Sequence, residues 1–214
     1  MNAVTLTLDE KDHQRVAAAI RNAEARTSGE IVCVLARASD SYFYPAALTL
    51  GAGILLASLL VAFGLDHYWI AMRLWHFVAA QMAASVCALG LIWLFPGMRI
   101  IFVPRQLRYR RAHRNAVTQF LSRNIHTTSG RTGVLIFLSL AERYAEVVAD
   151  AGIDSRVPQE TWDSIVGELV RHAASDRIVE GFEMAIAAAG ELLAREFPKR
   201  TTDVNELDDR LVEL

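Results

Sequence analysis

Charged residues are almost absent from the middle of this 214-residue sequence. Between Ser41 and Met98 the only charged side chains are Asp66 and Arg73, although the chain has 22 Lys and Arg and 24 Asp and Glu. Soluble domains carry about 25% charged residues, so a purely soluble globular protein does not fit this distribution. A polytopic transporter does not fit either, because the polar segments on both sides of the uncharged stretch are too long.

Cysteine is scarce as well, and the common catalytic motifs are absent. The two cysteines, Cys33 and Cys87, have no spacing typical of a disulfide framework or a zinc site, which favours a reducing compartment. The sequence contains no P-loop, no dinucleotide-binding glycine motif, no serine nucleophile elbow, no HExxH and no EF-hand. We therefore expect no cofactor and no metal site. The N-terminus lacks a basic segment followed by an apolar one, so we expect no cleavable signal peptide.

Two long apolar runs occupy the uncharged region. Residues 45–65 and 74–95 contain no charged side chain, and about 20 helical residues cross a hydrocarbon core roughly 30 Å thick. The short connection between them leaves no room for a domain. The sequence therefore predicts a transmembrane hairpin within residues 41–98, with a buried core hairpin of a soluble protein as the alternative. Aromatic residues of the kind found at membrane interfaces flank both runs: Tyr42, Tyr44, Tyr68, Trp69, Trp75 and Trp93.

Arginine is concentrated after the second apolar run. Residues 99–123 contain seven Arg and no Asp or Glu, whereas the connection between the runs contains Arg73 alone. The positive-inside rule then places both termini in the cytoplasm, at the plasma (inner) membrane. We expect the lipid bilayer and an unidentified membrane-associated protein as partners. We expect no nucleic acid, because no base-reading motif accompanies the arginines. The arginines also suit anionic head groups, with a topology signal alone as the alternative.

The remaining sequence alternates helix and strand patterns. Thr7 and Glu10 resemble a capping box, and the apolar, β-branched run 30–36 predicts a strand covered on both faces. One strand is not stable by itself, so its partners must come from after the hairpin. Strand patterns follow at 133–140 and 144–149, and helical patterns at 105–125, from Pro158 onward and at 176–197. We predict an α/β sandwich with a small central mixed sheet flanked by helices and interrupted by the transmembrane hairpin.

These elements define the expected domains. Residues 1–40 and 105–197 are expected to form one discontinuous domain, because the first piece is too small to bury a core by itself. Residues 99–104 are expected to be a basic juxtamembrane link. Residues 198–214 are expected to be an acidic tail.

Candidate ligand-binding residues come from three polar clusters beside the predicted strands. The loop 127–131 has free amides that suit an anion, with a plain loop as the alternative. Residues 142–143 follow a strand and suit either an oxyanion or a local ion pair. Residues 150–154 offer two carboxylates, fewer than the 6–8 oxygens of a calcium site. The candidates are Arg131, Glu142, Arg143, Asp150 and Asp154, and the two arginines are the expected contacts of a phosphate-like ligand.

Four segments carry a family pattern: Thr27–Val32, Arg131–Arg143, Asp150–Asp154 and Glu180–Phe182. In this order they resemble the TPM domain family over residues 6–37 and 105–197. The resemblance implies an α/β sandwich, membrane attachment in many members, and phosphatase activity or divalent-cation binding in some. A typical member has Asp or Asn immediately before the second strand, where this chain has Arg131 and Thr132. The resemblance therefore implies that a divalent cation could bind, whereas Arg131 and Thr132 in place of the acid or amide argue against it.

Two functions follow from these observations. The first is a non-catalytic binding or accessory module, anchored in the membrane, with its TPM-like domain in the cytoplasm. The alternative is a phosphatase that acts on phosphate esters through the polar loops at the end of the sheet. The absence of a nucleophile motif favours the first function, and no catalytic residue is assigned.

Overall fold

The computed structural model describes residues 8–71, 73–199 and 205–214. The chain divides into two compact units. One, which we name the sheet unit, combines residues 1–39 with residues 109–214. The other, the hairpin unit, comprises residues 40–108.

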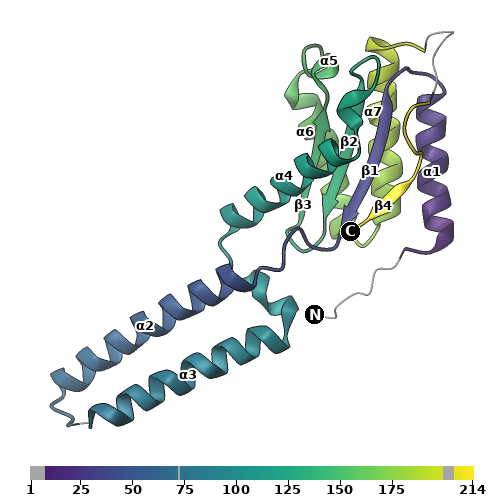
Figure 1. Ribbon diagram of the computed structural model, residues 1–214. Coiled ribbons are helices and arrows are strands. Elements are labelled where there is room, and N and C mark those ends of the chain that lie inside the picture. The colour runs from purple at the N-terminus through teal and green to yellow at the C-terminus, as the bar shows by residue number, and fades with distance from the viewer. Residues whose placement is uncertain (1–7, 72, 200–204) are drawn as a thin grey trace. The chain divides into compact units, whose positions relative to one another are not determined.

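Four strands form the centre of the sheet unit (Figure 1). β1 (Glu30–Ala36) is parallel to β2 (Gly133–Ser139), and β2 is antiparallel to β3 (Tyr144–Ala149). β4 (Leu211–Glu213) pairs in parallel with the other edge of β1, which gives the order β3-β2-β1-β4. The predicted small mixed sheet is confirmed. β4 was not predicted, because three residues within an acidic segment are too few to show a strand pattern.

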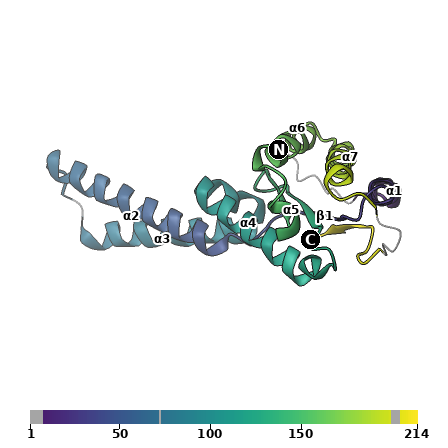
Figure 2. The same ribbon diagram turned by 90° about the horizontal axis from the view of Figure 1, so that it is seen from above.

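Helices cover both faces of this sheet. α1 (Glu10–Glu24), α6 (Gln159–Ala174) and α7 (Ile178–Glu196) lie on one face (Figure 2). α4 (Arg105–Ser122) packs against the opposite face through Ala116 and Phe120. The flanking helices of the predicted sandwich are therefore confirmed.

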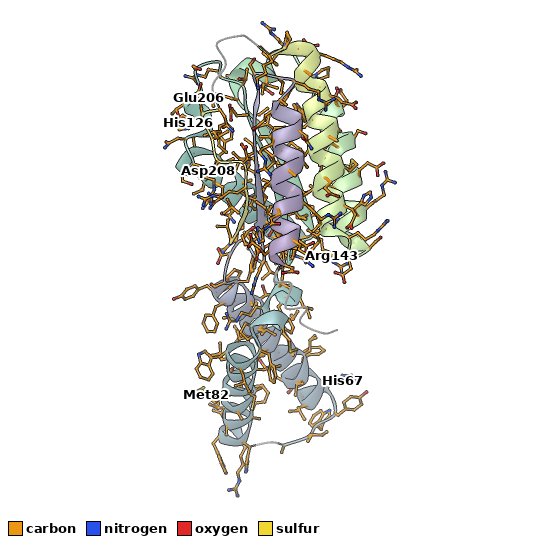
Figure 3. The ribbon with its side chains drawn as sticks, turned by 90° about the vertical axis from the view of Figure 1, so that its right-hand side faces the viewer. His67, Met82, His126, Arg143, Glu206 and Asp208 are labelled. Atoms are coloured by element: carbon orange, nitrogen blue, oxygen red, sulfur yellow. The ribbon has the colours of Figure 1, made fainter. Side chains whose placement is uncertain are left out.

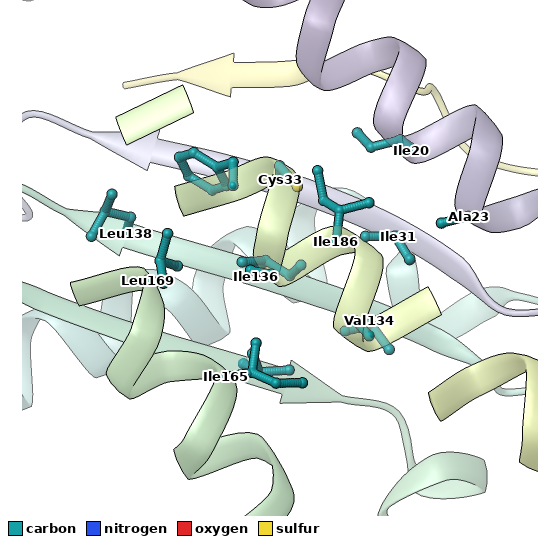
Figure 4. Close-up of a cluster of buried hydrophobic side chains, with 14 of the residues drawn as sticks. Ile20, Ala23, Ile31, Cys33, Val134, Ile136, Leu138, Ile165, Leu169 and Ile186 are labelled. Carbon is teal, nitrogen blue, oxygen red and sulfur yellow. The ribbon is translucent and has the colours of Figure 1, made fainter. Parts of the chain in front are cut away.

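Alternate residues of each strand contribute to two separate apolar clusters. Ile31 and Cys33 lie in the larger cluster with residues of α1, α6 and α7 (Figure 4). Val32 and Val34 lie in the smaller cluster beneath α4. Because both faces are covered, every residue of β1 and β2 is buried, as the continuous apolar runs predict.

The first described helix begins with a different capping residue from the predicted one. Asp9 is the N-cap of α1, and its carboxylate accepts a hydrogen bond from the Glu10 amide at 2.7 Å. The Asp12 carboxylate accepts one from the Asp9 amide at 3.2 Å and completes a capping box. Thr7, the predicted cap, lies outside the described residues. Pro158 likewise precedes α6 as its N-cap rather than forming its first residue.

Two long apolar helices dominate the hairpin unit. α2 (Phe43–His67) and α3 (Leu74–Leu94) are long and apolar enough to cross a membrane. A 3₁₀ helix, η1 (Pro96–Phe102), follows α3. Within the most apolar stretch of each long helix, only 6% of the residues are buried.

Arg99 joins the two ends of this hairpin. Its Nε donates a hydrogen bond to the Ile92 carbonyl at 2.7 Å, and Nη1 donates to the Ser41 carbonyl at 3.4 Å. The guanidinium also lies over the Phe43 ring, 5.4 Å from its centroid. A cation at the C-terminus of α3 satisfies helix carbonyls that have no intrahelical partner. The inserted segment therefore begins and ends at the same place within its own unit.

Candidate functional site

The five candidate residues lie at two opposite ends of the sheet. Arg131 precedes β2 and Asp150 follows β3, and the antiparallel pairing brings them together, with 3.7 Å between Arg131 Nη1 and Asp150 Oδ1. Glu142 and Arg143 lie in the turn between β2 and β3. A strand of this length separates the two ends by about 20 Å, and Figure 3 shows Arg143 far from Glu206, which lies at the Arg131 end. A single phosphate-sized ligand cannot contact both Arg131 and Arg143, so each arginine is a separate candidate at its own end of the sheet.

Asp150 organises the loop at its end of the sheet. Its side chain is 5% exposed, and Oδ1 accepts a hydrogen bond from the Ala151 amide at 2.7 Å, as the N-cap of α5 (Ala151–Asp154). A side chain at Gly152 would bring its Cβ to 2.5 Å from the Arg131 carbonyl oxygen. The two loops are thus packed in direct contact, and Asp150 fixes their geometry.

This end of the sheet does not fit a divalent cation. Asp154 is exposed at the end of α5, and the Arg131 guanidinium places positive charge beside Asp150. Among the residues that the structure describes, no group of three or more His, Cys, Asp or Glu side chains could hold a metal ion. A calcium ion needs six to eight oxygen ligands, and the described residues at this end of the sheet do not supply such a set.

The predicted anion-binding loop holds a carboxylate of the chain itself. The Ser129 amide donates to Glu206 Oε2 at 3.1 Å, and Ser129 Oγ donates to the same carboxylate. The Thr132 amide donates to Thr128 Oγ1 at 3.2 Å, which tightens the loop from within. The donors that the sequence suggests for an external anion are therefore engaged by the segment that leads into β4.

A cavity of about 500 Å³ borders this loop. Its lining combines hydroxyl groups with charges of both signs, among them Ser129, Thr132, Arg156, Lys199 and Glu206. Lys199 Nζ donates to the Glu24 carbonyl at 3.2 Å, and Arg156 Nη1 donates to the Glu196 carbonyl at 3.3 Å. Both cations are thus tied to the backbone at the rim of the cavity.

Glu24 is a buried acid that sequence reasoning missed. It is 8% exposed, and its Oε1 accepts a hydrogen bond from the Ile31 amide at 2.7 Å. The pKa of Glu24 is raised to about 9, chiefly by burial and in smaller part by the nearby carboxyl groups of Glu30 and Asp209. The helical spacing of Val16, Ile20 and Glu24 places all three on the buried side of α1, and this spacing is the signal that would have found it.

Glu142 joins the two parallel strands at the other end of the sheet. It is 2% exposed, and its Oε1 accepts a hydrogen bond from the Ser39 amide at 2.8 Å. Ser139 Oγ donates to the same carboxylate, and the hydroxyl oxygens of Ser39 and Ser139 are 3.1 Å apart. Glu142 therefore holds the segment after β1 against the end of β2, whereas Arg143 is exposed.

Comparison with known proteins matches part of the chain to a known domain. Residues 97–192, from η1 into α7, match the model of the TPM domain. The chain contains a TPM domain. The resemblance predicted from the sequence is confirmed, and the matched region includes α4, the β2–β3 pair and α6.

The fold has a solved counterpart of low sequence identity. The chain is similar to the NMR structure of the BA42 protein from the psychrophilic bacterium Bizionia argentinensis, with a TM-score of 0.61 and 18% identity over 100% of each chain. At this identity the likeness shows the fold alone. No curated protein matches the chain.

Proposed function

We propose that this protein is an integral membrane protein whose TPM domain lies in the cytoplasm and binds a membrane-associated partner without catalysis. In this proposal α2 and α3 cross the plasma (inner) membrane as a hairpin, and both termini are cytoplasmic. The observation that carries the proposal is the exposure of α2 and α3, whose apolar stretches are only 6% buried. A core hairpin of a soluble protein buries such helices.

The orientation rests on the distribution of arginine. Seven arginines lie within residues 99–123, after the second helix, and Arg73 alone lies between the helices. Basic residues near the ends of a span are retained on the cytoplasmic side. Because the two antiparallel helices return the chain to one side, β1 and the rest of the sheet then share the cytoplasm.

The candidate carboxylates accept hydrogen bonds from groups of the chain itself, and this supports a binding module over a phosphatase. Glu142 is bound by Ser39 and Ser139, and Asp150 Oδ1 caps α5. Both carboxylates hold loops together, at opposite ends of the sheet. A general acid and a general base must both reach one reacting group, and this arrangement does not bring the two together.

Two measurements on the full-length protein test this function. Alkaline carbonate washing of native membranes should leave the protein in the membrane fraction. Purified protein in detergent should hydrolyse p-nitrophenyl phosphate no faster than buffer, with or without Mg²⁺ or Ca²⁺. Release by carbonate would contradict the membrane hairpin, and hydrolysis that Asp150→Asn abolishes would establish the phosphatase instead.

A further inference from the structure

The outward face of α4 is basic. Ala112, Ala116 and Phe120 are buried on the side that faces the sheet. Arg110 and Arg114 are exposed, and their spacing of four residues places them together on the opposite side of the helix. This pair of exposed arginines, which we name the Arg110–Arg114 face, points away from the core of the sheet unit.

No acidic group in the described part of the chain neutralises this face. The side chains of Arg110 and Arg114 make no hydrogen bond or ion pair with any described residue. The acidic group beside the helix is Glu146, which is bound by His113 Nδ1 at 2.8 Å and by the Tyr144 hydroxyl at 3.0 Å. The positive charge of the face is therefore available to a ligand.

The sequence keeps α4 close to the end of the second apolar helix. α3 ends at Leu94 and α4 begins at Arg105. Most of the connection is η1, and a 3₁₀ helix rises only about 2.0 Å per residue. If α3 crosses the bilayer, the start of α4 lies within about 25 Å of the hydrocarbon core. The head-group layer occupies part of that distance.

The net charge of residues 99–123 is opposite in sign to that of residues 124–214. Residues 99–123 carry seven Arg and no acid, whereas residues 124–214 carry nine basic and seventeen acidic side chains. Leu121, two turns beyond Arg114, is 52% exposed. Basic side chains just beyond the cytoplasmic end of a span are attracted to anionic lipids, and the exposed leucine on the same side of α4 adds apolar surface there.

From these observations we infer that the Arg110–Arg114 face of α4 binds anionic lipid head groups. This inference rests on the proposed membrane hairpin and goes beyond it, because a topology signal needs the charge of the arginines but no contact with lipid. The phosphates of phosphatidylglycerol or phosphatidylserine are the matching ligands, since guanidinium groups bind phosphate oxygens through paired hydrogen bonds. Each arginine is expected to strengthen binding of α4 to an anionic surface roughly fivefold.

The test uses the full chain reconstituted into vesicles. An environment-sensitive fluorophore is attached at Thr118→Cys, on the outward side of α4, in a Cys87→Ser background. A head-group quencher is included in vesicles of phosphatidylcholine, with or without phosphatidylglycerol. We expect quenching only in the anionic vesicles, and we expect high salt to remove it because salt screens exposed charges.

Matched double variants separate a local contact from a change in net charge. Arg110→Gln with Arg114→Gln should abolish the quenching. Arg21→Gln with Arg195→Gln removes two exposed arginines from α1 and α7, on the other face of the sheet, and should leave it unchanged. Equal quenching in the two lipids, or equal loss in the two double variants, would overturn the inference. If this face bound an acidic protein and not lipid, the anionic vesicles would show no quenching, and that result would also overturn the inference.

Carbonate washing of the same vesicles distinguishes the two proposals. Protein that is washed off refutes the membrane hairpin itself. Protein that resists washing but shows no lipid-dependent quenching refutes only the contact of α4 with anionic lipid.

Discussion

Glu24 shows how one buried side chain makes the stability of the fold depend on pH. Its pKa rises from 4.5 to about 9, chiefly through burial. The folded protein therefore keeps this proton up to about pH 9, whereas the unfolded chain loses it near pH 4.5. The contribution of this proton to the free energy of unfolding is fully present below pH 4.5 and is lost as the pH rises to about 9. The slope is about 1.4 kcal/mol per pH unit at most.

An amide at this position should remove the pH dependence. Glu24→Gln keeps the shape of the side chain and stays neutral, so its Tm should exceed that of the wild type by more at pH 8 than at pH 5. Glu191→Gln, an exposed acid on α7, is the control and should shift little at either pH. Thermal unfolding of the full chain in detergent measures the difference. An equal difference in Tm between Glu24→Gln and the wild type at pH 5 and pH 8 would show that Glu24 is ionised in the folded protein.

Alanine at two glycine positions should change the stability of the fold in opposite directions. A Cβ at Gly133 would lie 2.4 Å from the Ile125 carbonyl oxygen, so Gly133→Ala forces the backbone apart and should cost roughly 1–3 kcal/mol. Gly167 lies in α6 with nothing within 4 Å of its Cβ position. Gly167→Ala should stabilise the fold by about 0.5–1 kcal/mol. Denaturant unfolding of both variants measures the pair, and a stabilised Gly133→Ala would contradict the packing at the start of β2.

At the scale of the elements, β4 extends the sheet into a segment expected to be a tail. Leu211 is 4% exposed and packs into the larger apolar cluster. Leu211→Ala should therefore lower the free energy of unfolding by about 2–3 kcal/mol. Leu214→Ala, where the side chain is 42% exposed, should have little effect. Equal, small effects in denaturant unfolding would mean that β4 adds nothing to the fold.

Local patterns predicted most elements because each element has its own periodicity. The runs at 30–36 and 144–149 coincide with β1 and β3, and the charge-free stretches lie within α2 and nearly coincide with α3. Contacts between distant segments have no such local pattern. Ser129 and Glu206 are 77 residues apart, and Ser39 and Glu142 are 103 apart. The sequence could therefore name Glu142 as a candidate but could not show that the amide of Ser39 is its partner.

At the scale of the whole molecule, β1 is separated from its neighbours in the sheet by the hairpin unit. β1 lies between β2 and β4, so the piece of chain after the hairpin lacks the central strand of its own sheet. Arg99 holds residues 41 and 92 together by hydrogen bonds. An insertion with closely spaced ends costs little loop-closure entropy.

Residues 1–40 and 105–197 are accordingly expected to fold as one unit. Replacing Ser41–Met98 with a flexible polar linker should give a soluble protein with one cooperative melting transition. Residues 105–214 alone should aggregate or melt without a sharp transition. Calorimetry of both proteins measures this, and sharp melting of residues 105–214 alone would refute a single discontinuous domain.

Labelling from the two sides of the membrane tests the central claim most directly. Ile70→Cys and Glu191→Cys are introduced one at a time into a Cys87→Ser background, in which the remaining Cys33 is buried. A membrane-impermeant maleimide should label residue 70 in intact cells and residue 191 only after permeabilisation, because the proposed topology has the turn of the hairpin outside and the TPM domain in the cytoplasm. Labelling of residue 191 in intact cells, or of residue 70 only after permeabilisation, would contradict this account.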